Sequence, residues 1–130
     1  PRLALVCDMR ITPRGNVTKF EFYEAVIRSW QRLTYTRVQE FLDAGALDVE
    51  APVQDSLREL KAVYDVLRAA RESRGALDFD THEAALELQD GHVCAIHPVS
   101  RLDAHRLIEE AMIAANVCAA RFLEGAGRPG

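Results

Sequence analysis

The sequence lacks a long hydrophobic run, an excess of positive charge and a regular pattern of cysteines. No apolar segment approaches the roughly 18 residues that a membrane-spanning helix requires, and no signal-peptide pattern opens the chain. The formal net charge is −4, so no overall basic field attracts a phosphate backbone, and nucleic-acid binding would depend on local groups. Three cysteines at wide spacing give no disulfide framework and favour reduced thiols in a cytoplasmic protein. We therefore expect no membrane partner and a cytoplasmic location.

Familiar catalytic and metal-binding motifs are also missing. There is no GxSxG elbow and no glycine-rich phosphate loop. His92, Cys94 and His97 lie close together, but they lack the paired spacing of zinc ligands. Asp78 and Asp80 alternate with apolar residues and share a face, which leaves a metal-dependent hydrolase site open but favours an exposed edge or loop.

The composition that is present indicates an ordinary globular protein. The 130 residues are 48% hydrophobic and 28% charged, which suits one domain or one piece of a larger domain. The chain starts without a methionine and ends in the breaker-rich run 125–130. We interpret these ends as those of a segment of a longer protein.

The first half of the sequence predicts a β-hairpin and a helix. Apolar and polar residues alternate over 3–11 and again from 17 to about 28, separated by the five-residue turn 12–16. Thr34 is a candidate N-cap, and Ala44-Gly45 is a usual helix end.

The second half predicts a long amphipathic helix, a second hairpin and a final helix. The amphipathic helix has Pro52 in its first turn and ends at Gly75. Asp90-Gly91 separates the expected strands 84–88 and 92–96. The last helix covers 101–124, with Ser100 or Asp103 as its cap. This order of elements favours an α+β fold over a parallel α/β fold.

A helical projection of 101–124 separates its polar residues into two groups. The projection predicts a buried apolar stripe composed of Ala104, Ile108, Ala111, Ala115, Cys118 and Phe122. It places Asp103, Glu110 and Arg121 on a solvent-exposed face. It places His105, Glu109 and Asn116 along one edge of the stripe, where a firmly held side chain can reach a ligand. Carboxylates at such an edge usually form a salt bridge or hydrogen bond and nothing more, so the projection alone favours a structural role for Glu109.

Aromatic residues raise a similar choice. Tyr35, Phe79 and Trp30 could each pack in the core. Aromatic side chains on the solvent side, near basic residues, could instead stack on nucleic-acid bases. Periodicity favours packing and does not decide the matter.

Three blocks of the sequence together resemble the ribonuclease II / ribonuclease R family, and the ribonuclease R branch more closely. They are EFYEAVIRSWQRLTYTRV (21–38), RESRGALDFDTHEA (71–84) and RLDAHRLIEEAMIAANVCAARFLE (101–124). The resemblance implies a middle portion of the catalytic domain of a 3′→5′ exoribonuclease. Such enzymes degrade single-stranded RNA from its 3′ end and release nucleoside 5′-monophosphates.

The resemblance also implies parts that this chain does not contain. Family members hold magnesium with an aspartate cluster near the start of the catalytic domain and use a catalytic arginine near its end. Cold-shock and S1 domains accompany them. Neither motif nor either domain is recognisable here, so we expect no catalytic residue and no metal ligand in this chain and no activity from it alone. The rest of the parent chain is its expected partner, and exposed sheet edges could cause self-association.

Three residues correspond to RNA-contacting positions through the resemblance, and two more lie on the same helix edge as one of them. Tyr35 in LTYTRV matches a tyrosine near the ribose, and Glu109 in LIEEAMIAAN matches a glutamate that reads the 2′-hydroxyl. Phe79 in GALDFD matches a phenylalanine that stacks on bases. Arg101 and His105 lie on the same helix edge as Glu109 and could reach phosphate or ribose. Leu102 replaces a residue that is usually polar in this branch, which weakens a role for the first turn.

Two other functions remain as alternatives. The chain could be a small non-enzymatic α+β protein-interaction domain in which Glu109 is purely structural. A stand-alone metal-dependent hydrolase that uses Asp78 and Asp80 is the less favoured alternative.

Overall fold

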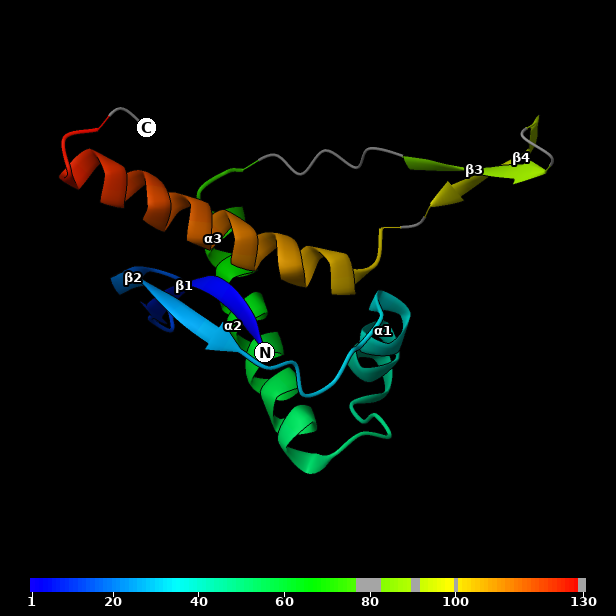
Figure 1. The fold of residues 1–130 in the computed structure, drawn as a ribbon, viewed down its shortest axis with the longest axis horizontal. Coiled ribbons are helices and arrows are strands. Elements are labelled where there is room, and N and C mark those ends of the chain that lie inside the picture. The colour runs from blue at the N-terminus through cyan, green and yellow to red at the C-terminus, as the bar shows by residue number, and fades with distance from the viewer. Residues whose placement is uncertain (77–82, 90–91, 100, 129–130) are drawn as a thin grey trace.

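The computed structural model describes residues 1–76, 83–89, 92–99 and 101–128. These residues form an α+β fold, as predicted, with two antiparallel hairpins and three helices (Figure 1). In chain order the elements are β1 (Arg2–Ile11), β2 (Val17–Ile27), α1 (Tyr35–Ala44), α2 (Ala51–Ser73), β3 (Glu83–Gln89), β4 (His92–Val99) and α3 (Asp103–Gly125). The α3 helix packs against both α1 and α2. None of the described helices is long and apolar enough to span a membrane.

The first hairpin forms as predicted, with β2 ending at Ile27. Its strands pair in antiparallel register, with Leu3 opposite Val26 and Met9 opposite Phe20. The register shifts beside Ile11, which is a local bulge. Phe22 of β2 makes an edge-to-face contact with Phe122 of α3, with ring centroids 5.5 Å apart. The hairpin is thereby attached to the last helix.

The loop of this hairpin packs on α2. Gly15 has a φ of +74°, a conformation that L side chains rarely adopt. A Cβ at this position would lie 2.9 Å from the carbonyl oxygen of Val66 and would collide with the Ala70 side chain. Glycine is therefore required both by the turn and by the close approach to α2.

The α1 helix has the two ends that the sequence predicts. The Thr34 hydroxyl accepts a hydrogen bond from the Arg37 main-chain N–H at 3.3 Å. Gly45 adopts the left-handed conformation, and its N–H bonds to the Phe41 carbonyl. These caps fix Tyr35 as the first helical residue.

The α2 helix carries Pro52 in its first turn, as predicted, and ends at Ser73, two residues before Gly75. A small apolar core joins its start to α1 through Phe41, Leu47 and Leu57. Further along α2, Tyr64 and Leu67 are buried. The amphipathic prediction is confirmed at these positions.

The second hairpin also forms, with strands longer than predicted. Residues Glu83–Gln89 pair with His92–Val99, and the predicted Asp90-Gly91 turn lies outside the described residues. Asp78 and Asp80 lie outside them too. The hairpin extends away from the helices (Figure 1).

The cap prediction for α3 is wrong at Asp103. Asp103 is the first helical residue, the N-cap is Leu102, and Ser100 lies outside the described residues. The Leu102 main-chain N–H donates to Nδ1 of His105 at 3.1 Å. A side chain three residues into the helix thus satisfies the N–H group at the cap, as in one half of a capping box.

The predicted faces of α3 are displaced by about one residue. The buried residues are Ala104, Leu107, Glu110, Ala114 and Cys118. Ile108 and Phe122, which were expected in the buried stripe, are exposed. Glu110, which was expected to face solvent, is only 6% exposed. The cause is an ion pair with Arg71 of α2, which compensates the burial of the carboxylate.

Candidate functional site

The candidate site lies where the first turns of α1 and α3 meet. The Tyr35 and His105 rings stack with centroids 4.1 Å apart and planes inclined by 26°. The two residues are 70 positions apart in the sequence. The packing of α3 against α1 therefore creates this pair.

A second contact supports the same junction. The Gln39 side-chain oxygen accepts a hydrogen bond from the Ala104 main-chain N–H at 3.1 Å. Gln39 lies one helical turn after Tyr35, so both side chains project from the same side of α1. It satisfies one of the N–H groups that have no partner within the first turn of a helix. Sequence reasoning missed Gln39, although its spacing from Tyr35 is a signal that could have indicated it.

His105 makes two contacts at this junction, one through Nδ1 and one through a face of its ring. Because Nδ1 accepts the Leu102 N–H, a neutral imidazole carries its proton on Nε2. One face of the same ring lies against Tyr35. The imidazole is therefore held in a fixed orientation between the helix cap and the tyrosine.

Glu109 follows His105 by one turn of α3. Its carboxylate forms an ion pair with the Arg101 guanidinium, and both side chains are partly exposed. A carboxylate accepts several hydrogen bonds, so this pairing leaves capacity for a ligand hydroxyl. The site thus combines an aromatic platform with a hydroxyl acceptor, which suits binding rather than chemical activation.

The structure places four of the five predicted site residues in two pairs. Tyr35 stacks on His105, and Arg101 pairs with Glu109, which lies one turn of α3 after His105. Phe79 lies outside the described residues. Asn116, predicted on the same edge, is exposed about two turns beyond Glu109 on α3. Whether these residues contact RNA stays a prediction.

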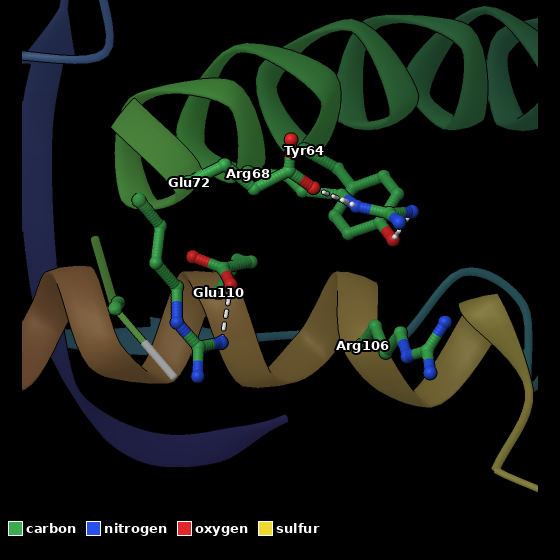
Figure 2. A pocket seen from close by; sticks show the side chains of 7 residues that line it. Tyr64, Arg68, Glu72, Arg106 and Glu110 are labelled. Carbon is green, nitrogen blue, oxygen red and sulfur yellow. Dashed lines mark hydrogen bonds and ion pairs between the residues drawn. The ribbon is translucent and has the colours of Figure 1, made fainter. Parts of the chain in front are cut away.

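A separate polar cluster joins α2 to α3 around a cavity of about 50 Å³ (Figure 2). Arg71 donates from Nη1 to Oε1 of Glu110 at 2.8 Å across the two helices. This pair is more buried than the Arg101–Glu109 pair. The Arg71–Glu110 ion pair thus links α2 to α3 at a buried position that apolar side chains usually occupy.

Tyr64 connects the other groups of this cluster. Its hydroxyl accepts from Arg68 at 3.1 Å and donates to Asp103 at 3.3 Å. Burial raises the pKa of Tyr64; the Asp103 charge raises it further, and the Arg68 hydrogen bond opposes the increase. Arg106 also contacts Asp103, at 3.3 Å. We interpret this cluster as structural, because each of these groups serves the helix interface.

The residues that the structure describes include no group of three or more His, Cys, Asp and Glu side chains able to hold a metal ion. His92 and Cys94 of β4 are both exposed. The described residues do not fit a magnesium or zinc site, and no metal-dependent step is assigned to them.

Comparison with known proteins gives consistent matches across the chain. The protein-family model of the RNB domain matches residues 1–130 of the sequence. Ribonuclease R of Escherichia coli K12 is 44% identical over 98% of the chain, which covers 16% of that protein. Ribonuclease R of Vibrio parahaemolyticus is 40% identical, with the same coverage of each. The solved structure of Mycoplasma genitalium RNase R in complex with ribose-methylated single-stranded RNA superposes with a TM-score of 0.89 at 25% identity, over 97% of this chain and 20% of that one. The chain spans about a sixth of the length of these curated relatives.

Proposed function

Since the chain belongs to the RNB-domain family, we propose that it is part of the catalytic domain of a 3′→5′ exoribonuclease. The parent protein would hydrolyse single-stranded RNA to nucleoside 5′-monophosphates in the cytoplasm. The similarity to ribonuclease R over nearly the whole chain supports this activity. The family match and the fold supply no support for the interaction-domain alternative. The contribution of this segment would be binding of the substrate through Tyr35 and Glu109.

The single observation that carries the proposal is the meeting of Tyr35 with the edge of α3 that bears Glu109. An RNA ribose offers a 2′-hydroxyl that can donate to a carboxylate, and DNA lacks this group. Tyr35 beside the sugar and Glu109 on the hydroxyl would let the site distinguish the two. Single-stranded RNA bound to the similar Mycoplasma genitalium protein supports RNA as the ligand class.

The remaining predicted contacts complete this proposal. Arg101 already pairs with Glu109, so it would orient that carboxylate and lie near the substrate phosphates. His105 would act through Tyr35, against which its ring stacks. Phe79 would stack on a base close to the 3′ end, and alanine at this position would weaken binding by about 1–3 kcal/mol.

Magnesium would be held elsewhere in the parent protein. Phosphodiester hydrolysis by paired metal ions needs carboxylates that converge on the ions. An aspartate cluster upstream of Pro1 in the parent sequence would supply them. The chain alone, given magnesium and single-stranded RNA, is therefore expected to release no mononucleotides, and robust release would contradict this division of roles.

The test of ribose recognition uses the full-length parent protein and two oligonucleotides that differ only in the sugar at the 3′ end. Glu109→Gln should reduce the preference for RNA over DNA by about tenfold or more, the size of one hydrogen bond to a charged group. Tyr35→Ala should reduce the preference as well, because it removes the ring beside the sugar. Rates of mononucleotide release on both substrates measure the preference.

The matched control is Glu59→Gln, an exposed carboxylate of α2 away from the site. This variant should keep the full preference. If Glu109→Gln and Tyr35→Ala also keep it while remaining folded, the carboxylate is structural and the proposal of ribose recognition is wrong.

A further inference from the structure

We propose that His105 is a positioning residue that holds the Tyr35 ring over the edge of α3 that carries Glu109, rather than a direct RNA contact. The proposal rests on the proposed ribose recognition, because it explains how Tyr35 is kept in place for that role. The evidence is the stacked geometry, the fixed orientation of the imidazole and the exposure of the tyrosine.

Tyr35 depends on its neighbour for a defined orientation. It is the first residue of α1 and is 46% exposed. In the part of the chain that the structure describes, no hydrogen bond fixes its hydroxyl group; the stack on His105 is the ring contact that restrains it. A half-exposed ring without such a contact would sample several staggered rotamers.

His105 itself is held more firmly than an ordinary surface histidine. Its Nδ1 accepts the N–H of Leu102, which ties the imidazole to the helix start. The Gln39–Ala104 hydrogen bond fixes the same turn of α3 to α1. The ring plane is therefore set by the backbone, and it presents one constant face to Tyr35.

The spacing along α3 connects this face to the proposed acceptor. His105 and Glu109 are four residues apart, so their side chains lie one above the other on one side of the helix. A tyrosine stacked on His105 is thus kept close to the side that bears the carboxylate. The hydrogen bond to the Leu102 N–H alone does not explain a histidine at this position, since glutamine or glutamate usually accepts the N-cap N–H there. Stacking on Tyr35 requires a ring, which histidine provides and glutamine does not.

Two substitutions separate the two roles of His105. His105→Gln keeps a side-chain acceptor for the Leu102 N–H but removes the ring. His105→Phe keeps a ring for Tyr35 but removes the acceptor. If His105 only supports the fold, the variant that is less stable should also show the weaker preference for RNA. If His105 positions Tyr35, the preference should depend on the ring and not on stability.

The experiment measures thermal unfolding and RNA-over-DNA preference for both variants in the full-length parent protein. His105→Gln should unfold near the wild-type temperature and lose preference about three- to tenfold, the size of a lost aromatic pair. His105→Phe should unfold at a lower temperature yet keep its preference within about twofold, since the aromatic pair remains. Equal loss in both variants, or full preference in both, would overturn the inference.

Tyr35→Ala and the double variant Tyr35→Ala/His105→Gln distinguish this inference from the proposed function. If His105 acts through Tyr35, the double variant should lose no more preference than Tyr35→Ala alone. A loss in Tyr35→Ala without a loss in His105→Gln would refute positioning and leave ribose recognition standing. Unchanged preference in Tyr35→Ala would refute positioning, and unchanged preference in both Tyr35→Ala and Glu109→Gln would also refute ribose recognition.

Discussion

Glu109 and Glu110 are adjacent, chemically identical and yet placed in different environments. Glu110 points into the contact between α2 and α3 and pairs with Arg71. Glu109 lies on the partly exposed edge of α3 and pairs with Arg101. Arg101 lies eight residues earlier, just before the helix begins. Successive helical residues are rotated by about 100° around the helix axis. One helix can therefore direct one carboxylate into the contact with α2 and the next onto its exposed edge.

This difference predicts losses of stability of different size for two neighbouring substitutions. Glu110→Ala should lower the free energy of unfolding by about 3 kcal/mol, because it leaves the Arg71 guanidinium partly buried without this carboxylate. Glu109→Ala should cost less than about 1 kcal/mol, as is usual for a partly exposed pair. Urea denaturation of both variants measures the difference. Equal destabilisation would show that the two pairs are energetically alike.

The thiol of Cys7 gives a second prediction at the residue scale. Burial raises the pKa of Cys7, and the neighbouring Cys118 thiol and the Asp8 carboxylate raise it further. A raised pKa leaves less thiolate at a given pH and so slows the reaction of the thiol. A maleimide should therefore modify exposed Cys94 first, then Cys7, and buried Cys118 only after unfolding.

Peptide mass spectrometry of the labelled chain, folded and in urea, would test this order. The folded state binds the Cys7 proton more tightly than the unfolded state, so stability should fall as the pH rises through the ordinary cysteine range towards the raised value. Cys7→Ala should reduce this decline. Labelling of Cys7 as fast as Cys94 in the folded chain would contradict the assignment.

At the scale of elements, the turn of the first hairpin is also a packing surface. Gly15 combines a positive φ with close approach to Val66 and Ala70 of α2. Gly15→Ala should lower the free energy of unfolding by about 1–3 kcal/mol from the strained conformation alone. The collision of its methyl group with α2 should add to this loss.

Gly45→Ala is the matched control for this prediction. Gly45 has nearly the same φ of +75°, but a Cβ there meets nothing within 4 Å. The control variant retains the conformational cost and lacks the collision. Thermal unfolding of the two variants should therefore differ, and equal melting temperatures would show that the loop does not pack tightly on α2.

Elements governed by local chemistry could be predicted from the sequence, and contacts between elements could not. The Thr34 cap and the left-handed Gly45 act within a few residues, so the bounds of α1 were predicted correctly. The α3 faces were misjudged because the partner of Glu110 is Arg71, 39 positions earlier. The same reason applies to the Tyr35–His105 stack, which no local pattern indicates. The resemblance to the ribonuclease R branch identified the family correctly. It singled out Tyr35 and Glu109, but it did not specify their contacts with His105 and Arg101.

At the scale of the whole molecule, the first hairpin leaves an apolar face uncovered in the described structure. Leu3 is 89% exposed, its cross-strand partner Val26 is 68% exposed, and Leu5 projects to the same side. Exposed apolar patches on a sheet are typical of surfaces that meet another segment. The chain spans about a sixth of its relatives' length, so much of a relative's sequence has no counterpart here that could cover this face.

We predict that the purified chain self-associates through this face and that the parent protein covers it. Leu3→Lys/Val26→Lys should keep the isolated chain monomeric in sedimentation velocity, because two charges on the patch oppose its burial. Met112→Lys, at an exposed position of α3, should leave the association unchanged. In the full-length parent, Leu3→Lys/Val26→Lys should instead lower the melting temperature, since it would bury charge against the covering segment. A wild-type chain that stays monomeric at high concentration would show that this face does not drive association.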